Sequence, residues 1–431
     1  AHNLKVGGSN PSPATNLMIK NILKDYSEIK NNDKLFFLTF SLFPISLILG
    51  NLVINIFISL FSLSFLFNLK QNPFLKNKIA YLLLFFFLSL LVNVFFSQYP
   101  INSLPRVIKF IFVAFFIIET LRIFNKYNSN LIKRVFLIWS VIFIIVLLDC
   151  IFEIIFGFNT LGISTTLNGR IASFFGEELV VGAFVHGFAL FFIGYLVSQN
   201  FNNYILAFFI LTIIIISFLI GERSNFIKLF FSIALFSIIV IKTGFYKKIL
   251  TFISIIFITF VIVNFNQDYK YRYYTQIKNL YQKNGLIDYY KNSQYGAHHS
   301  TAIKIFYEYP LFGVGIKNFR YESIKEKYND SNYTTSNARQ ATHPHQIHLE
   351  FLSETGIFGY FCFISFILFC LFAVLKEYLK NRNVFQLSSI IFVLSSLIPF
   401  LPSGSFLSTF NSGIFWINFA IMIGYCKILK K

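Results

Sequence analysis

The stretch ATHPHQIHLEFLSETGIFGYFCFISFILFCLFAVL, residues 341–375, joins a polar, ionisable segment to an apolar one. Three histidines and two glutamates fall within the twelve positions from His343 to Glu354. The apolar run that follows is long enough to cross the roughly 30 Å hydrocarbon core of a bilayer. Because so dense an ionisable cluster stands at the mouth of a membrane span, we take this junction as a candidate functional site at the membrane surface.

The composition is typical of a chain embedded in lipid. Of the 431 residues, 56% are hydrophobic and 13% are charged, and the mean hydropathy is +0.65. A soluble protein of this length has no core large enough to hide that much apolar surface. The four cysteines lie in or beside apolar segments without metal-type spacing, so we expect neither a disulfide framework nor cysteine chemistry.

About twelve windows are apolar enough to span a membrane, which predicts an all-α polytopic membrane protein with about 12 transmembrane helices. The predicted spans cover residues 35–50, 52–69, 79–96, 107–124, 135–156, 179–198, 203–220, 226–241, 247–265, 351–375, 384–400 and 405–426. The predicted organisation is a nine-helix membrane portion at 18–265, a loop domain at 266–350 and three more helices at 351–431.

Two segments fall outside the predicted spans. Residues 1–17 resemble neither a signal peptide nor a membrane segment, and Gly8-Ser9-Asn10-Pro11 can be encoded by the T-arm of a bacterial tRNA gene. We therefore interpret 1–17 as a mis-assigned extension and Met18 as the natural start. Residues 266–350 are polar and rich in tyrosine, as in YKYRYYTQIKNLYQ, and predict a small folded domain outside the membrane.

The basic residues indicate the orientation of the chain. Lysines and arginines gather in alternate connections, while the short connections between them hold almost none beyond Arg106, Arg170 and Arg223. Because cytoplasmic loops carry the excess of basic residues, both termini are expected in the cytoplasm. Topology therefore explains the formal charge of +19, and no nucleic-acid partner is expected.

The histidine cluster is predicted to begin a membrane helix. Thr342 or His343 can cap this helix, and Pro344 suits its first turn, where no amide hydrogen is needed. The helix is expected to continue without a break into 351–375. His345 would then lie on the first turn, where free amide groups and the positive helix end favour an anion, phosphate above all. The predicted face of His345 also carries Leu349, Leu352 and Gly356.

Two other interpretations fit the same histidines. Histidine tolerates the boundary between water and lipid, although three within six residues exceed what that role requires. His343, His345 and His348 also offer three nitrogens to a metal. Because His343 and His345 flank a proline and no fourth ligand is obvious, no metal is expected.

A second motif, IGERSNF at residues 220–226, places Arg223 at the start of a predicted span. An arginine at membrane depth is costly, and its planar fork fits the oxygens of a diphosphate. The alternative is a snorkelling arginine paired with Glu222.

A third motif, NGRIASFFGEELVVG at residues 168–182, carries the lone external Arg170 together with Glu177 and Glu178. The two carboxylates either complement the dipole of the following helix or line a cavity for a polar substrate.

A fourth motif, YPLFGVGIKNFR at residues 309–320, contains Gly313 and Gly315. No Gly-Lys-Ser/Thr follows, so a nucleotide-binding loop is unsupported and a tight turn is expected. Lys317 and Arg320 remain candidates for contact with a phosphate.

These four motifs occur in one order, and together they resemble the O-antigen ligase and O-antigen polymerase superfamily. The matching elements are RIASFFGEELVVGAF, GERSN, YPLFGVGIKNFR and THPHQIHLEFLSETGIFGYF. The last element is similar to the family pattern His-Pro-His-Asn followed by Glu-x-Gly-x-x-Gly. Gln346 replaces the asparagine, and His348 stands at a site more often apolar or aromatic. The second phosphate-binding arginine of ligases has no clean counterpart, so Arg272 or Arg320 would take its role.

The resemblance implies a GT-C-like fold and an inverting transfer of a glycan from undecaprenyl diphosphate to an acceptor hydroxyl, without metal or cofactor. It implies His345 as the base, with His343 as the other candidate. The diphosphate would be bound by Arg223, Arg170, Arg320 and Arg272. Glu354, Glu178 and His348 would support these residues.

The resemblance also implies a periplasmic site in the bacterial inner membrane. The acceptor would be a lipid A core sugar for a ligase, the next lipid-linked repeat for a polymerase, or a protein hydroxyl for a third variant. A flippase or transporter of lipid-linked sugars is the alternative from another class. We find no internal repeat of the kind transporters carry, and the candidate intramembrane carboxylates are few, namely Glu119, Asp149 and Glu153.

Overall fold

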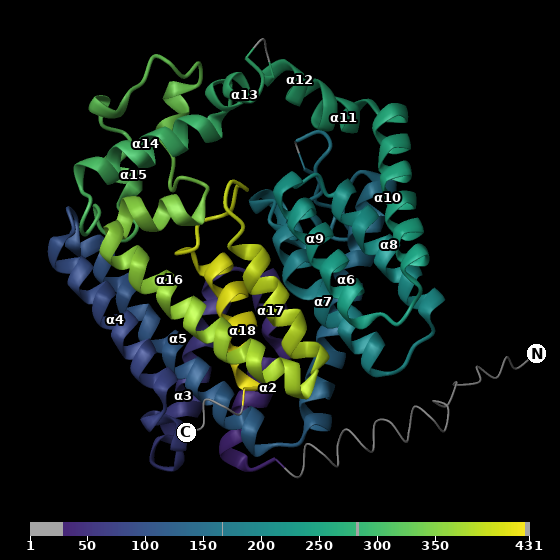
Figure 1. The fold of residues 1–431 in the computed structure, drawn as a ribbon, viewed down its shortest axis with the longest axis vertical. Helices are drawn as coiled ribbons and strands as arrows, with labels where there is room; N and C mark the ends of the chain where they lie inside the picture. Colours follow the sequence, from purple (N-terminus) through teal and green to yellow (C-terminus); the bar gives the residue numbers. More distant parts are fainter. Residues whose placement is uncertain (1–28, 166, 282–283, 427–431) are drawn as a thin grey trace, which may run out of the picture.

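The chain forms a bundle of long helices with a layer of short helices across one end (Figure 1). The computed structural model describes residues 29–165, 167–281 and 284–426, and the predicted extension at 1–17 with its start at Met18 lies outside them. The long helices of the bundle are α2 (Asn31–Leu49), α3 (Asn51–Phe67), α4 (Lys78–Phe96), α5 (Pro100–Lys126), α6 (Ser129–Phe156), α7 (Val181–Ser198), α8 (Asn203–Leu219), α9 (Arg223–Val240), α10 (Phe245–Phe265), α16 (Ile347–Asn381), α17 (Val384–Ser396) and α18 (Thr409–Gly424).

Each predicted span coincides with one of these long helices. Seven of the described helices are long and apolar enough to cross a membrane: α2, α4, α6, α7, α9, α10 and α16. Helices α3, α8, α17 and α18 are shorter but apolar. Helix α5 is 27 residues long and carries several charged side chains. The structure thus agrees with a polytopic membrane protein, while the crossing of the membrane by all twelve helices stays a prediction.

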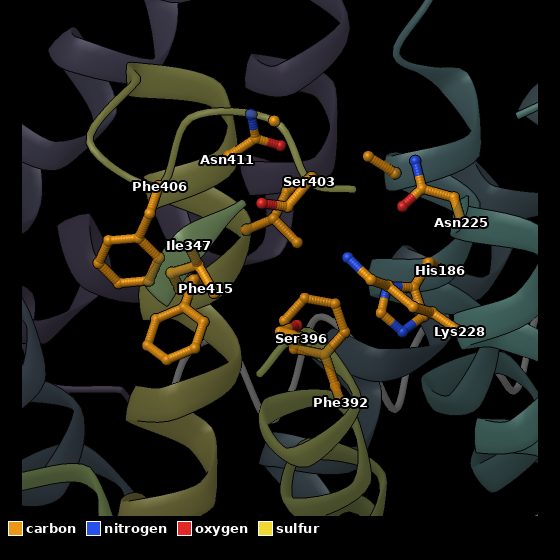
Figure 2. A pocket seen from close by; sticks show the side chains of 13 residues that line it. His186, Asn225, Lys228, Ile347, Phe392, Ser396, Ser403, Phe406, Asn411 and Phe415 are labelled. Carbon is orange, nitrogen blue, oxygen red and sulfur yellow. The ribbon is translucent and has the colours of Figure 1, made fainter. Parts of the chain in front are cut away.

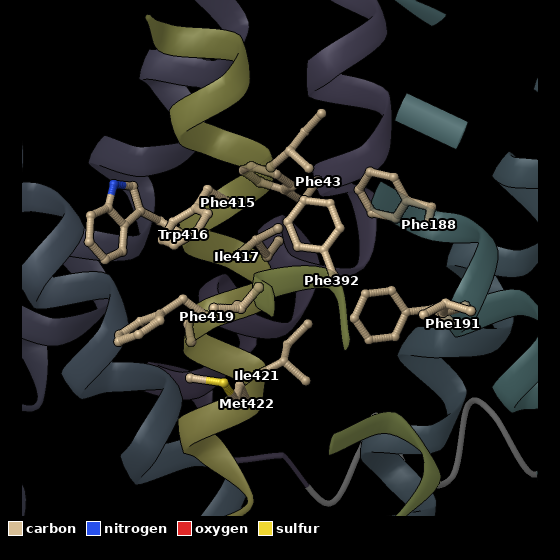
Figure 3. Packing of buried hydrophobic residues seen from close by; sticks show 14 of the residues in the cluster. Phe43, Phe188, Phe191, Phe392, Phe415, Trp416, Ile417, Phe419, Ile421 and Met422 are labelled. Carbon is tan, nitrogen blue, oxygen red and sulfur yellow. The ribbon is translucent and has the colours of Figure 1, made fainter. Parts of the chain in front are cut away.

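One continuous apolar core runs through the bundle. Helix α18 lies inside it, because it packs against α3, α5, α7 and α17. Figure 3 shows Phe415 and Ile417 of α18 near Phe392 of α17, with Phe188 and Phe191 extending from α7 toward the same layer. Helix α10, by contrast, has only 6% of its apolar window buried, so its exposed apolar surface suits contact with lipid.

The polar segment between α10 and α16 forms the layer of short helices. These are α11 (Gln267–Lys270), the π-helical η4 (Tyr271–Thr275), α12 (Gln276–Leu280), α13 (Leu286–Asn292), α14 (Gln294–Glu308), α15 (Phe319–Glu322), η5 (Glu326–Tyr328) and η6 (Ser336–Arg339). Figure 1 shows the layer crossing from α10 on the right to α15 above α4 on the left. It has a small apolar cluster of its own, made by Ala302, Ile305, Val314, Phe319 and Tyr328. Its place outside the membrane stays a prediction.

Helix α16 begins three residues later than the predicted start at Pro344. Gln346 caps it, because the side-chain oxygen of Gln346 accepts the amide hydrogen of Leu349 at 2.7 Å. His345 has a left-handed φ of 54°, and its carbonyl accepts the amide hydrogen of Ser403 at 2.8 Å. His345 therefore lies in the turn before the helix, and the predicted helical face shared by His345 and Leu349 is wrong.

The predicted unbroken helix is also wrong at Gly356, where α16 is interrupted at φ 64° and ψ −172°. The tight turn predicted at Gly313 and Gly315 is confirmed, with φ values of 66° and 104°, and the residues around this turn pack against the break. The amide of Ile357 donates to the carbonyl of Pro310 at 2.8 Å. The break thus turns backbone groups of α16 outward to bind the 309–320 segment.

Gly356→Ala is expected to destabilise the protein. A backbone at φ 64° and ψ −172° is essentially restricted to glycine and costs another residue about 1–3 kcal/mol, and the added Cβ would lie 2.3 Å from the Leu311 carbonyl oxygen. Thermal unfolding of the purified protein in detergent measures the effect. Gly244→Ala is the matched control, because a Cβ at Gly244 meets no atom within 4 Å. Equal unfolding temperatures for the two variants would contradict this account of the break.

Candidate functional site

The candidate site lies where the layer of short helices meets the end of the bundle. The four segments expected from the sequence all contribute, namely 168–182, 220–226, 309–320 and 341–350. A fifth, the 397–408 connection between α17 and α18, was not anticipated. Figure 1 shows this connection rising from the bundle toward the layer of short helices. The predicted spans 384–400 and 405–426 include most of the 397–408 connection, although α17 ends at Ser396 and α18 begins at Thr409.

Two buried carboxylates on α16 hold the loops of the site. Glu350 accepts the amide hydrogen of Phe406 at 2.7 Å and the hydroxyl of Ser405. Glu354, one turn further along, accepts the amide hydrogens of Lys317 at 2.6 Å and of Phe319 at 3.3 Å. Both carboxylates are fully buried, so each is stabilised by loop groups rather than by water. The expected supporting role of Glu354 thus takes the form of anchoring the 309–320 segment.

Three of the four candidate arginines, Arg170, Arg223 and Arg272, lie together and are called the arginine group. Burial, together with the charges of Arg170 and Arg223, lowers the pKa of Arg272 to about 10. In the described part of the chain their one ion-pair partner is Glu222, whose carboxylate lies 3.6 Å from Arg170. Arg223 donates instead to Gln276 of α12. The group therefore keeps a net positive charge that suits a multivalent anion.

Side chains of the short helices fix Arg272 by binding the end of α8. The Tyr273 hydroxyl donates to the Phe218 carbonyl at 2.7 Å, and the Tyr269 hydroxyl donates to the Leu219 carbonyl at 2.8 Å. The last carbonyls of a helix have no partner within it, and lipid cannot supply one. These bonds therefore satisfy the end of α8 and attach the layer of short helices to the bundle.

Carboxylates of α6 position the segment that carries Arg170. Glu153 accepts the amide hydrogen of Ser173 at 2.6 Å. Asp149 accepts the Ser173 hydroxyl at 2.6 Å and the Thr160 amide hydrogen at 2.9 Å. These two acidic residues therefore act as loop anchors rather than as free charges within the bundle.

Four histidines, His298, His299, His343 and His345, form a second cluster, called the histidine group. The rings of His343 and His345 lie 3.9 Å apart, and His345 stacks on His298 of α14 at 4.9 Å. Burial and the neighbouring charges lower the pKa of His343 to about 2 and that of His345 to about 4. Both rings are therefore neutral at physiological pH.

One peptide unit of the 397–408 connection joins the arginine and histidine groups. Ser224, next to Arg223, donates its hydroxyl to the carbonyl of Pro402. The following residue, Ser403, donates its amide hydrogen to the carbonyl of His345 at 2.8 Å. Because Pro402 and Ser403 are consecutive, the start of α9 and the histidine turn are held on the two sides of a single peptide link.

A cavity continues the site into the bundle between α7, α9, α17 and α18, and it encloses about 550 Å³ of empty space, part of it open solvent. Figure 2 shows Lys228 and Asn225 of α9 extending into it, with His186 of α7 beside them and Ser403 across the gap. The Lys228 ammonium lies 3.3 Å from the Pro402 carbonyl oxygen, and no described carboxylate forms an ion pair with it. The cavity thus combines one cation with amide and hydroxyl groups and aromatic walls.

Sequence analysis missed Lys228 and His186, although a signal for both was present. Each lies inside a predicted span, where an ionisable side chain is costly and is usually retained for function. Glu222 was considered only as a partner for Arg223, whereas the structure pairs it with Arg170. That pairing joins two separate loops, and no local pattern indicates it.

Three candidate residues lie away from the arginine and histidine groups. The charge of Arg320 lowers the pKa of the Lys317 ammonium, and Arg320 is not part of the arginine group. Glu178 is exposed, and the amide of Gly182 at the start of α7 donates instead to Glu222 at 2.9 Å.

The ring of His348 joins two helices. Its Nε2 donates to the carbonyl of Leu397 at 2.9 Å, which leaves Nδ1 to accept the hydroxyl of Tyr360 at 3.0 Å. Both nitrogens are therefore occupied in packing α16 against the end of α17. Across the described ranges, no group of three or more His, Cys, Asp or Glu is arranged to hold a metal ion.

Comparison with known families gives one match. Residues 206–364, from α8 through the first turns of α16 beyond its break, match the family model described as O-antigen ligase. Over this stretch the match confirms the resemblance to the O-antigen ligase superfamily, and it contains Arg223, Arg272 and the histidine group. No curated protein matches the chain.

The histidine group predicts a loss of stability in acid. Burial and the charges of His298 and His345 lower the pKa of His299 to about 4, below the usual value of about 6.5. Between these values the unfolded chain binds a proton that the folded chain does not, so stability present above pH 6.5 is lost as the pH falls toward 4. Unfolding temperatures at pH 7 and pH 4.5 should differ less for His299→Gln than for the unmodified protein. An equal difference in both proteins would contradict the neutral, buried state of this ring.

Proposed function

We propose that this protein transfers a glycan from undecaprenyl diphosphate to an acceptor hydroxyl at the periplasmic face of the bacterial inner membrane. The observation that carries the proposal is the peptide link at Pro402–Ser403, which holds a cationic group and a neutral histidine pair side by side. Cations suit a diphosphate, and neutral histidine suits a hydroxyl that must lose its proton.

The donor would be bound by the arginine group and by Lys228. Arg170, Arg223 and Arg272 would bind the diphosphate oxygens. The cavity below them would receive the carrier end of the donor, with Lys228 near the phosphate bonded to the lipid and aromatic side chains around the first prenyl units. Fixed cations are most effective where negative charge grows during the reaction, and here that charge grows on the departing diphosphate.

His345 would act as the base, with the tilted ring of His343 beside it. The acceptor oxygen forms a bond to the anomeric carbon while the bond from that carbon to the diphosphate oxygen breaks. The hydroxyl proton passes to a ring nitrogen of His345, and the electron pair leaves with the lipid diphosphate. Attack from the face opposite the leaving group inverts the anomeric centre, and the step requires neither metal nor cofactor.

Two acceptors fit this chemistry. A ligase would use a sugar of the lipid A core, and a polymerase would use the next lipid-linked repeat. The proposed topology places both chain termini in the cytoplasm and the layer of short helices in the periplasm. That orientation follows from the basic connections and from the periplasmic location of the proposed glycan donors.

His345→Ala and Arg223→Ala are expected to abolish surface glycan when they replace the native protein in cells, as read on a gel of surface polysaccharide. Loss of a general base typically lowers the rate about 10²–10⁴-fold, which leaves no visible product. His343→Ala distinguishes the two candidate bases. In a deletion strain, full-length polymer left on the carrier lipid indicates a ligase, and single repeats attached to the core indicate a polymerase.

Arg382→Ala is the matched control, because Arg382 is an exposed arginine that ends α16 far along the chain from the site motifs. It should leave surface glycan unchanged. Normal glycan in His345→Ala and Arg223→Ala cells, with both variants inserted at the native level, would rule out the proposed assignment.

A further inference from the structure

A second set of cations lies apart from the arginine group. It consists of Arg106 and Lys109 of α5 with Lys317 and Arg320 of the 309–320 segment, and is called the second cation group. Arg106 and Arg320 both repel the ammonium of Lys317, and Arg106 also repels Lys109. Four positive side chains from two distant parts of the sequence are therefore gathered in one neighbourhood.

Glu350 and Glu354 offset the charge of Lys317, and most of the remaining charge is not balanced by a carboxylate of the described residues. Within the described ranges no carboxylate forms an ion pair with Arg106, Lys109 or Arg320, and the nearest acid to Lys317 is Glu350 at 4.0 Å. The Nε of Arg320 is buried without a hydrogen-bond partner. Leaving a buried donor unpaired is costly, so this Nε points to a ligand that completes it.

Two members of the second cation group border a pocket between α4, α5, α16 and α18, which encloses about 510 Å³ of empty space, part of it open solvent. Arg106 and Lys109 line it together with Ile316 and Ser408, and Lys109 donates to Thr409 at the start of α18 at 2.9 Å. The rest of the lining is largely apolar and includes Phe86, Leu90, Phe110, Val113 and Trp416. Cations beside an apolar cavity at the end of a membrane bundle suit an anionic head attached to an acyl or prenyl chain.

The two cation groups approach the histidine group from different sides. The charge of Lys317 lowers the pKa of His343, so the second cation group lies near the ring beside the proposed base. Figure 1 shows α4 and α15 on one side of α16–α18, and α9 and α11, which carry or adjoin the arginine group, on the other. A substrate on each side would meet at the histidines.

We propose that the second cation group is the acceptor site and binds the phosphate of the acceptor glycolipid. This inference rests on the proposed glycan transfer and locates the site of its second substrate. The lipid chain occupies the cavity along α5, the phosphate contacts Arg106, Lys109 and Arg320, and the sugar hydroxyl lies at the histidine pair. A protein acceptor would carry neither the phosphate nor the lipid chain.

The test is the binding of glycolipids to the purified protein, measured by native mass spectrometry. Arg106→Gln combined with Lys109→Gln should weaken binding of phosphorylated lipid A core at least tenfold, or about 1.4 kcal/mol. The same glycolipid after removal of its phosphates should bind weakly to both proteins. Lys376→Gln combined with Lys380→Gln removes two exposed charges elsewhere and should leave binding unchanged.

A second set of binding measurements identifies which phosphorylated lipid is the acceptor. Binding of a single undecaprenyl-diphosphate repeat is measured with Arg223→Ala in every protein, so that the donor side contributes less. Loss of binding for the core glycolipid alone supports a ligase acceptor, and loss for the lipid-linked repeat alone supports a polymerase acceptor. The inference is overturned if the double variant binds both phosphorylated lipids normally, or if removing phosphate does not weaken binding to the unmodified protein.

Failure of the two proposals can be told apart. Binding is read without turnover, so a protein that binds phosphorylated glycolipid through Arg106 and Lys109 but transfers no glycan would refute only the proposed function. A protein that requires His345 for transfer but binds the glycolipid equally well with and without these two cations would refute only the acceptor site.

Discussion

Two carboxylates, one turn apart on a helix that is itself interrupted, organise the whole site. Glu350 binds Ser405 and Phe406 of one loop, and Glu354 binds Lys317 and Phe319 of another. Both carboxyl groups are buried, so each needs hydrogen-bond partners from the protein, and the loops cannot move away without leaving a buried polar group unpaired. The break at Gly356 adds backbone bonds to the same loop and makes the arrangement rigid.

Some charged residues of this protein are paired with each other, whereas others have no partner of opposite charge among the described residues. Glu119 is neutralised by Arg122, which also pairs with Asp33 at the opposite end of the bundle, and Asp149 is bound by loop donors. The charges of these groups are balanced within the protein. The arginine group and the second cation group are not balanced in this way, because each has more positive charge than the nearby carboxylates can offset. Two cationic groups near a neutral histidine pair suit the proposed reaction between two anionic lipids.

Much of the fold was predictable from the sequence, because apolar windows of membrane length mark helices without reference to their neighbours. The four motifs also predicted most segments of the site. The left-handed turn at His345 was not predictable, since it depends on a bond to Ser403, and the proline pattern favoured a helix start instead. The pairing of Arg170 with Glu222, and the approach of Arg320 to α5, arise from contacts between distant segments that leave no local signature.

The central claim is that a lipid diphosphate binds at the arginine group, between α9 and the layer of short helices. The most direct test is photo-crosslinking with an undecaprenyl diphosphate that carries a diazirine on its first prenyl unit, followed by peptide mapping. The account predicts labelled peptides from 220–228 and from the adjoining cavity wall at 392–404. Labelling confined to the opposite end of the bundle, around 119–127, would contradict it.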